Sequence, residues 1–438
     1  MPLSLRSALR LPEAPCLALI GAGGKSTALF QLARAYPPPV LLSATTHLSL
    51  EQCQMADHHL ILLRPGILPW EGVILVTGAA SDPPGKMRGV EAAVLGHLRL
   101  EAQQRHIPFL LECDGSRQKP LKAPAEHEPP IPDFVEIVIM VVGLSGVGQP
   151  LEETYVHRAA RFAELSGLKM GERVSAEALA RLLNHPQGGL KNIPRRARRV
   201  VLLNQADDAD RQALGARLAG MLLPLWDAVL IARLQTEEIF AVHERVAGIV
   251  LAAGASARFG KPKQVLEWEG KPLVRHVGEQ ALQAGLKPLL VVTGNAHAEV
   301  EAALRGLEVK LVFNPAWQSG QASSIRAGIE ALRHLDPQVG AAIFLLADQP
   351  GVNPQVLQAL VEHHAGTLVA VVAPLVGGQR ANPVLFDRVT FDDLLKLEGD
   401  QGGRAIFSRY PPQFLPWHDE ALLFDIDTPQ DVERWQRR

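Results

Sequence analysis

The sequence has little cysteine and no long apolar run. Its three cysteines, Cys16, Cys53 and Cys113, show no CxxC spacing, and their odd number fits a reducing cytoplasm better than a disulfide framework. No stretch of about 18 consecutive apolar residues is present, which argues against a membrane span. The N-terminus MPLSLRSALRLPEAP lacks the apolar core of a signal peptide, so we expect a cytoplasmic protein.

An excess of positive charge is also missing. The 438 residues include 44 Lys and Arg against 46 Asp and Glu, and the net charge is −2. Because nucleic-acid-binding domains usually carry a basic surplus, nucleic acid is not an expected partner. A hydrophobic content of 47% and a charged content of 21% are typical of a soluble globular protein. The chain is longer than a single hydrophobic core usually supports, so we expect at least two domains.

Apolar runs that indicate strands alternate with helical stretches, the pattern of a parallel sheet with helical crossovers. We predict an α/β fold with two Rossmann-like three-layer units, residues 1–240 and 246–438, joined by a connecting segment at 234–245. The second unit is expected to have a mixed, mostly parallel sheet. The predicted strands are 16–20, 40–42, 60–63, 73–76, 109–113, 135–142, 200–203 and 229–232, then 246–251, 289–292, 310–313, 342–346, 369–372 and 422–426.

A loop rich in small residues follows the run at 246–251. Its sequence LAAGASARFGKPK lets backbone N–H groups close on an anion and adds Arg258 and Lys263 where phosphate charge would lie. Asp348 in LADQP and Asp427 in DIDTP each follow an apolar run, and open α/β sheets bind ligands at such strand ends. A phosphate loop with two carboxylates indicates nucleotidyl transfer with a divalent metal.

These segments resemble the molybdenum-cofactor nucleotidyltransferase (MobA-like) family, whose loop pattern is LA[AG]GxSxRMGxxK. Phe259 stands in the usual methionine place. Further segments follow in the family's order, namely NPAWQSGQASSIRAG (314–328), LADQP (346–350), ANPVLF (381–386) with GDQGGR (399–404), and DIDTP (425–429). LAAG, DQP and the NPVLF and GDQGGR pair look like the cytidylyltransferase branch. The resemblance implies transfer of CMP from CTP to Mo-molybdopterin with release of pyrophosphate.

Each residue type suits a role in that reaction. Lys263 would place a charge on the α-phosphate, and Arg258 would bind the oxygens that leave as pyrophosphate. Asp348 and Asp427 are oxygen ligands suited to Mg²⁺. The remaining nucleotide-binding positions expected in this half are Leu251, Ala252, Ala253, Gly254, Ser256, Gly260 and Ser323.

Several of these residues have structural alternatives. Asp348 could form a strand-end turn before proline, and one of Asp425 and Asp427 could cap a following helix. Trp317 could pack in the core or form a wall for the pterin or base. The pair Ser323 and Ser324 could contact the nucleotide or cap a helix.

A second loop, IGAGGKST (20–27), lies between a predicted strand and a predicted helix. A lysine followed by hydroxyls at such a junction is the P-loop arrangement, but the full GxxxxGK[ST] pattern would need glycine where Leu19 stands. The loop is shorter, like those of Mur-type ligases, and the alternative is a tight glycine turn. Asp114 follows the run at 109–113, where a Walker B carboxylate would hold Mg²⁺. The predicted nucleotide-binding residues are Gly21, Gly23, Gly24, Lys25, Ser26, Thr27 and Asp114.

The motifs GAGGKST, SATTH (43–47), DGSRQKPLKAPAEHEP (114–129) and the pair His157 and Arg158 resemble YqeC-type accessory proteins. Those proteins are linked to selenium-dependent molybdenum hydroxylases, so a molybdenum hydroxylase apoenzyme is an implied partner. The resemblance covers roughly residues 5–240. It implies the biological context of this unit but no particular reaction. We expect Cys113 to be a buried core cysteine.

The hypothesis is therefore a fusion of a nucleotide-binding accessory unit with a cytidylyltransferase. Two alternatives stay open. One is another NTP transferase that uses GTP or a sugar phosphate and shares the glycine loop. The other is a non-catalytic carrier or insertion chaperone, in which the second half only binds finished dinucleotide cofactor.

Overall fold

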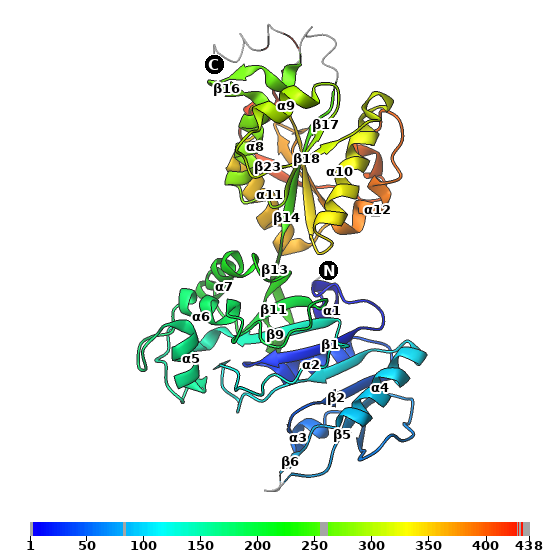
Figure 1. The fold of residues 1–438 in the computed structure, drawn as a ribbon, viewed down its shortest axis with the longest axis vertical. Coiled ribbons are helices and arrows are strands. Elements are labelled where there is room, and N and C mark those ends of the chain that lie inside the picture. Colours follow the sequence, from blue (N-terminus) through cyan, green and yellow to red (C-terminus); the bar gives the residue numbers. More distant parts are fainter. Residues whose placement is uncertain (1–2, 82–84, 255–261, 427, 429–430, 432–438) are drawn as a thin grey trace. The chain divides into compact units, whose positions relative to one another are not determined.

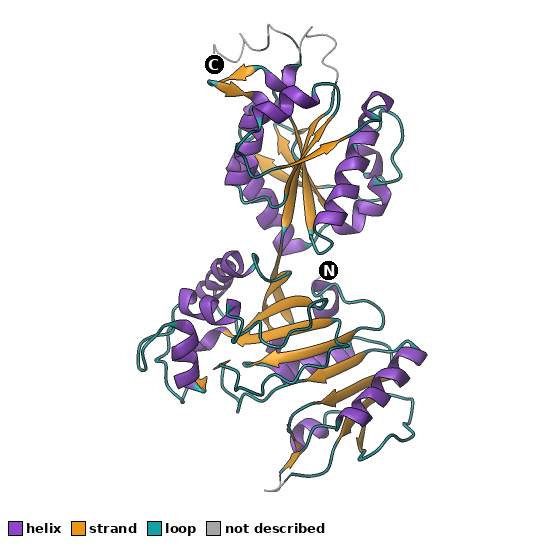
Figure 2. Cartoon of the chain, viewed as in Figure 1, coloured by secondary structure: helices purple, strands orange, loops and turns teal. Residues whose placement is uncertain are grey.

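The computed structural model describes residues 3–81, 85–254, 262–426, 428 and 431. Contacts within the chain divide it into two compact units, Met1–His243 and Glu244–Arg438. Figures 1 and 2 show that each unit is a sheet of strands with helices packed on it. Within the described ranges, no helix is both long and apolar enough to cross a membrane. The chain is thus an α/β protein with one large sheet in each unit.

The main sheet of the first unit has strongly apolar central strands. Its central strands are buried along their whole length and pair in parallel, as expected for a sheet covered on both faces. In spatial order the strands are β13 (Glu238–Glu244), β12 (Ala228–Arg233), β11 (Arg198–Asn204), β9 (Ile137–Gly143), β1 (Cys16–Gly21), β7 (Phe109–Glu112), β2 (Val40–Ala44), β5 (Val73–Thr77) and β4 (His58–Ile61).

Helices and short strands complete the first unit. The helices are α1 (Leu5–Ala8), α2 (Lys25–Arg34), α3 (Leu50–Cys53), α4 (Ala92–Arg105), α5 (Ala159–Ser166), α6 (Ala176–Asn184) and α7 (Ala209–Leu222). Strand β8 (Leu121–Lys122) pairs in parallel with β10 (Val156–His157), and β3 (Leu48–Ser49) pairs with β6 (Lys86–Met87). The β8–β10 register sets Lys122 opposite His157, which matters for the site described below.

The sheet of the second unit is mixed, as predicted. Its strands run in the order β18 (Lys310–Phe313), β17 (Leu289–Thr293), β14 (Val246–Ala252), β19 (Ala341–Leu346), β22 (Val384–Asp387), β20 (Val371–Val376) and β21 (Gln379–Arg380), with β23 (Gln413–Trp417) on β20. The pairings among β18, β17, β14 and β19 are parallel, whereas β22 is antiparallel to both of its neighbours.

Helices cover both faces of this second sheet (Figure 1). On one face, α8 (Leu273–Gln283) and α11 (Pro354–Thr367) bury Val277 and Leu360 in one core. On the other face, α10 (Gln321–Leu335) and α12 (Phe391–Leu394) bury Ile329 and Phe391 in a second core. Helix α9 (His297–Ala303) and the hairpin of β15 (Glu267–Trp268) and β16 (Lys271–Pro272) also belong to this unit.

Two local predictions were wrong. Residues 234–245 form strand β13 after a short 3-10 turn, because Val242 and Glu244 are buried at the two-residue period of a strand. Residues 422–426 do not form a strand. The Asp419 side chain accepts the backbone N–H of Ala421 and caps a 3-10 helix over Glu420–Leu423, which takes up the start of this segment.

Candidate functional site

A cavity of about 430 Å³ lies where β14 ends in the second unit. Strand β14 lies between β17 and β19, so the chain continues from β14 to a neighbour on one side and later returns to its other side. Such a switch point is where open α/β sheets bind their ligands. The lining residues are Leu251, Ala253, Gly254, Lys263, Gln264, Trp317, Gln318, Gly320, Gln321, Ser324, Leu346, Ala347, Asp348 and Asp400.

The described ends of the glycine loop are held in place by side chains. Gln264 Nε2 donates a hydrogen bond to the carbonyl of Gly254 at 2.8 Å. Trp317 is half-buried and lines the cavity, so the structure places it at the wall. A Cβ at Gly294 would lie 2.8 Å from the Trp317 side chain, so glycine at this position leaves room for the tryptophan. Ser256, Arg258 and Gly260 lie outside the described residues.

Lys263 and Asp348 meet at this cavity. The Lys263 ammonium forms an ion pair with the Asp348 carboxylate, and each side chain keeps 20% of its surface exposed. The segment at Asp425 comes to the same place, because Ile426 N–H donates to the Asp348 carbonyl at 3.1 Å and Gln349 Nε2 donates to Asp425 Oδ1 at 2.6 Å. The structure therefore joins two of the predicted motifs, while Asp427 itself lies outside the described residues.

The predicted serines lie at the start of α10. Asn314 Nδ2 donates to Ser323 Oγ at 2.8 Å and to Ser324 Oγ at 3.1 Å, and Ser323 Oγ donates to the Gly320 carbonyl. Gly320 occupies the N-cap position, so the capping alternative for the serines was wrong. Ser324 lines the cavity, whereas Ala252 is buried within β14.

Asp348 contributes one carboxylate to the cavity wall, a group of the kind that can bind a divalent cation. Within the part of the chain that the structure describes, three His, Cys, Asp or Glu side chains do not gather anywhere into a possible metal site. Mg²⁺ is commonly held by one or two carboxylates with substrate phosphates supplying the rest. A cation at Asp348 would thus need the nucleotide as a co-ligand.

In the first unit, the loop after β1 wraps around a buried lysine. Lys25 is 4% exposed, and its ammonium donates to the Gly21 carbonyl at 2.7 Å. Gly23 and Gly24 have φ values of 84° and 132°, and a Cβ at Gly23 would lie 2.4 Å from the backbone nitrogen of Gly143. Only glycine adopts this path without strain, so the loop packs directly against the backbone at Gly143.

Asp114 organises this loop. It accepts the Gly21 N–H with both oxygens, at 2.9 and 3.1 Å, and it forms ion pairs with Lys25 at 3.2 Å and with Lys122 at 2.8 Å. The Ser26 hydroxyl donates a hydrogen bond to Glu112 Oε2 at 3.2 Å. Among the predicted residues of this loop, Thr27 is exposed.

Glu112 was missed by the sequence analysis, although it precedes Cys113 in the ECDG motif. It is 5% exposed, and its Oε1 lies 4.0 Å from the Lys25 ammonium. Burial raises the pKa of this carboxyl, against the lowering effect of the Lys25 charge. Burial also raises the pKa of the Cys113 thiol to about 12, which agrees with its prediction as a core cysteine.

Beyond the loop, side chains of alternating charge bind one another in a chain. Lys122 Nζ donates to Glu128 at 2.9 Å, and Arg158 binds both oxygens of Glu128, at 2.7 and 2.9 Å. Burial alone would raise the pKa of Glu128, but Arg158 and Lys122 hold it at about 2. Burial, with the charges of Arg158 and Lys122, lowers the pKa of His157 to about 4, so its ring is neutral near pH 7.

Asn204 holds the loop from a third strand. Its Nδ2 donates to the Gly23 carbonyl at 2.7 Å, and its Oδ1 accepts the Leu234 N–H at 2.9 Å. The segment LLNQADD (202–208) therefore supports the loop backbone. Three strand ends (β1, β7 and β11) thus meet at one site.

Two family descriptions match separate parts of the chain. The YqeC protein family matches residues 17–160, and the MobA-like NTP transferase domain matches residues 248–414. The glycine loop of the first unit lies in the first range, and the cavity with Lys263 and Asp348 lies in the second.

Two curated relatives and one solved structure also match this chain, each over less than half of its length. The uncharacterized protein YqeC of Escherichia coli K12 is 34% identical over 197 residues, which are 43% of this chain and 75% of that protein. The nicotine blue oxidoreductase of Paenarthrobacter nicotinovorans is 30% identical over 199 residues, covering 43% of this chain and 95% of that protein. The crystal structure of Rv0371c from Mycobacterium tuberculosis H37Rv covers 44% of this chain and 98% of that one, at 28% identity and a TM-score of 0.40. The chain therefore belongs to the YqeC family through its first part and to the MobA-like NTP transferases through its second, which is a nucleotidyltransferase domain.

Proposed function

We propose that the second unit is a molybdenum cofactor cytidylyltransferase, which transfers CMP from CTP to the terminal phosphate of Mo-molybdopterin and releases pyrophosphate. The observation that carries this proposal is the meeting of Lys263 and Asp348 in a cavity at the end of β14. One group is suited to an α-phosphate and the other to a divalent cation, and both line a space of about 430 Å³.

The residues of the chain would act mainly by position and charge. Lys263 neutralises the charge that builds on the α-phosphate, and Trp317 offers a flat surface for a base or a pterin. The acceptor phosphate is already ionised at neutral pH, so no general base is needed. Pyrophosphate leaves as the new bond forms, and Arg258 is proposed to bind it.

Asp348 and Asp427 are proposed to hold Mg²⁺. When bound, the cation would neutralise the triphosphate and the attacking phosphate. The choice of CTP rests on the segments LAAG, DQP and GDQGGR, which look like the cytidylyltransferase branch. The relative named as an oxidoreductase gives a reason to test redox activity in the same preparations.

The first unit is proposed to bind a nucleotide at the loop from Gly21 to Thr27, as an accessory to molybdenum hydroxylase maturation. The support is the glycine loop around Lys25, with Ser26 beside Glu112 and Asp114 at the strand end. A molybdenum hydroxylase apoenzyme is the proposed client. We divide the two activities between residues 1–240 and 246–438.

Turnover of the full chain with Mg²⁺, Mo-molybdopterin and each of CTP, GTP, ATP and UTP tests the proposal. We expect pyrophosphate release with CTP at a rate well above that with the other three, and loss of this release in Lys263→Ala. Equal release with GTP would contradict the nucleotide assignment. Tight binding of finished dinucleotide cofactor without any pyrophosphate release would support a carrier, and oxidation of NADH or NADPH alone would support a redox enzyme.

A further inference from the structure

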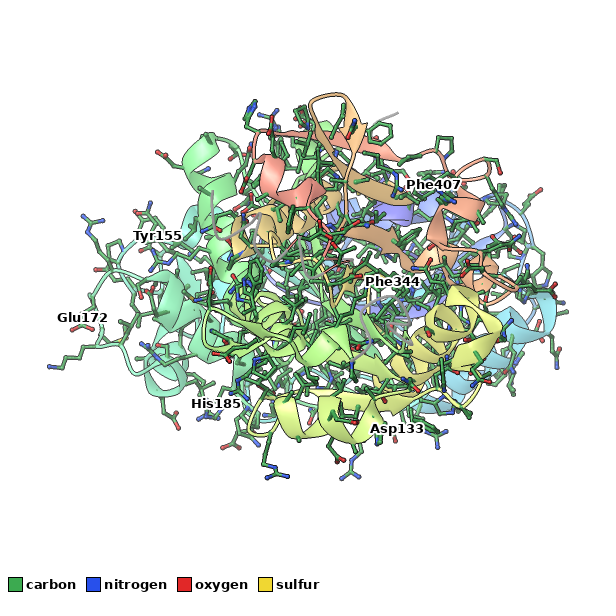
Figure 3. All side chains as sticks on the ribbon, turned by 90° about the horizontal axis from the view of Figure 1, so that it is seen from above. Asp133, Tyr155, Glu172, His185, Phe344 and Phe407 are labelled. Carbon is green, nitrogen blue, oxygen red and sulfur yellow. The ribbon has the colours of Figure 1, made fainter. Side chains whose placement is uncertain are left out.

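The turn that carries Asp348 begins just after β19 ends. That strand contains Phe344, which Figure 3 labels and which packs edge to face on Phe386 in the core. Within the turn at 348–350, all of which the structure describes, only Asp348 lines the cavity. A carboxylate at a strand end stays in one place only if the turn that bears it is held by its surroundings.

The C-terminal segment binds this turn at two adjacent residues. The Ile426 N–H donates to the Asp348 carbonyl at 3.1 Å, and Gln349 Nε2 donates to Asp425 Oδ1 at 2.6 Å. The second bond is charge-assisted, because its acceptor is a carboxylate. Two neighbouring residues of one segment are thus bound to two neighbouring residues of the other, so neither segment can shift alone.

Helix α8 and Ala421 contact the rest of the turn. His276 on α8 donates from Nε2 to the Pro350 carbonyl at 3.2 Å. Burial lowers the pKa of His276, so its ring is neutral near pH 7. A Cβ at Gly351 would lie 2.1 Å from the Ala421 carbonyl oxygen, so the C-terminal segment packs directly on the backbone there. Residues 348–351 are therefore all held by contacts from outside the turn.

The C-terminal segment is itself anchored against the hairpin that follows Lys263. Ile426 is fully buried and belongs to a small core with Trp268 and Leu273. Trp268 lies in the β15–β16 hairpin, directly after the 3-10 turn at 263–265. The segment therefore contacts both the turn of Asp348 and the hairpin next to Lys263 in the chain.

The buried amide of Gln349 is explained better by positioning than by stability. The side chain is 4% exposed, and its Oε1 has no hydrogen-bond partner among the described residues. A buried acceptor without a partner costs free energy, which an apolar side chain of similar size would avoid. What Gln349 adds over such a side chain is its bond to Asp425.

We propose that Gln349 and Asp425 are positioning residues, which act through the backbone of this turn to hold the Asp348 carboxylate where it meets Lys263 and the cation–nucleotide complex. The inference rests on the proposed function and adds to it two residues that lie outside the cavity wall. Removal of partners that orient a metal-binding carboxylate typically costs about 10- to 100-fold in metal affinity or activity.

Steady-state kinetics and urea unfolding of the full chain test this inference together. Gln349→Met should lower kcat with CTP, and raise the Mg²⁺ concentration that gives half-maximal rate, each by about 10-fold or more. The urea midpoint should fall no further than in Gln355→Met, the matched control at an exposed glutamine. A lower urea midpoint with unchanged Mg²⁺ dependence would show a merely structural role and overturn the inference, as would wild-type kinetics.

A double-mutant cycle tests whether the two residues act through one contact. Asp425→Ala should reproduce the loss in Gln349→Met, and the double variant should lose no more than either single variant, because the same bond is removed. Asp425→Asn keeps an oxygen at the acceptor position and should keep most of the rate. A loss of about 100-fold in Asp425→Asn would make Asp425 a metal ligand and overturn its positioning role.

Hydrogen exchange keeps the inference testable if no nucleotide is turned over. Peptides covering 348–352 and 422–426 should exchange about 10-fold faster in Gln349→Met than in the wild-type chain, while other peptides of the second unit keep their rates. Unchanged exchange in both peptides would overturn the inference. Faster exchange, in a wild-type chain that releases no pyrophosphate, would support the inference and refute the proposed reaction alone.

Discussion

Replacing Glu128 by glutamine should destabilise the first unit strongly. Glu128 is 7% exposed, and it lies between the ammonium of Lys122 and the guanidinium of Arg158. A fall of its pKa from 4.5 to about 2 corresponds to about 3 kcal/mol of folding free energy at neutral pH. The neutral amide cannot balance two cations, although Lys122 keeps its bond to Asp114 and Arg158 keeps the Ala123 carbonyl.

The ion pairs of Glu128 also predict how the free energy of unfolding changes with pH. Because the folded pKa of Glu128 lies below the unfolded one, its stabilisation is complete above about pH 4.5 and is lost as the pH falls toward 2. The difference in the free energy of unfolding between wild type and Glu128→Gln should therefore be largest near pH 7. It should shrink steadily below pH 4.5.

Urea unfolding, read by hydrogen exchange in peptides of the first unit, measures this difference at each pH. Glu126→Gln is the control, because Glu126 is exposed and two residues away. A Glu128→Gln protein as stable as Glu126→Gln at pH 7 would refute the reasoning. So would a difference that grows as the pH falls.

Other predictions concern the two proposed sites. Asp348→Asn should lower the rate of transfer by about two orders of magnitude, because a neutral amide cannot replace a metal-binding carboxylate; near-normal kcat in a folded protein would contradict the assignment. Lys263→Ala should reduce kcat more than it raises the KM for CTP, and the reverse result would make Lys263 a binding residue only. Lys25→Ala should abolish nucleotide binding to the first unit in calorimetry while pyrophosphate release from CTP continues. A fragment starting at Glu244 should fold and transfer CMP alone, and rescue of an inactive fragment by residues 1–240 would indicate a shared site.

The sequence predicts best where a strand runs directly into a loop. The runs before Gly21 and before Ala253 are continuous and apolar, so both loops and Asp348 could be placed at strand ends from the pattern alone. Such residues are positioned by the backbone path of one segment. Local pattern is enough to find them.

Pairings between distant segments could not be predicted in this way. Glu128 and Arg158 lie 30 residues apart, and they meet because the two-residue strands β8 and β10 pair in a fixed register. Strands that short carry no readable period. Strand β13 was missed for a related reason, since its glutamates hide the alternation, and only the fold shows that Glu244 is buried.

The contact between Lys263 and Asp348 has a thermodynamic consequence for ligand binding. Lys263 and Asp348 form an ion pair, so their two charges offset each other. A bare triphosphate meets the repulsion of Asp348, and a bare cation meets that of Lys263. A cation–nucleotide complex can instead engage both groups at once. Binding of Mg²⁺ and of CTP should therefore be mutually reinforcing, each lowering the apparent dissociation constant of the other by the same factor.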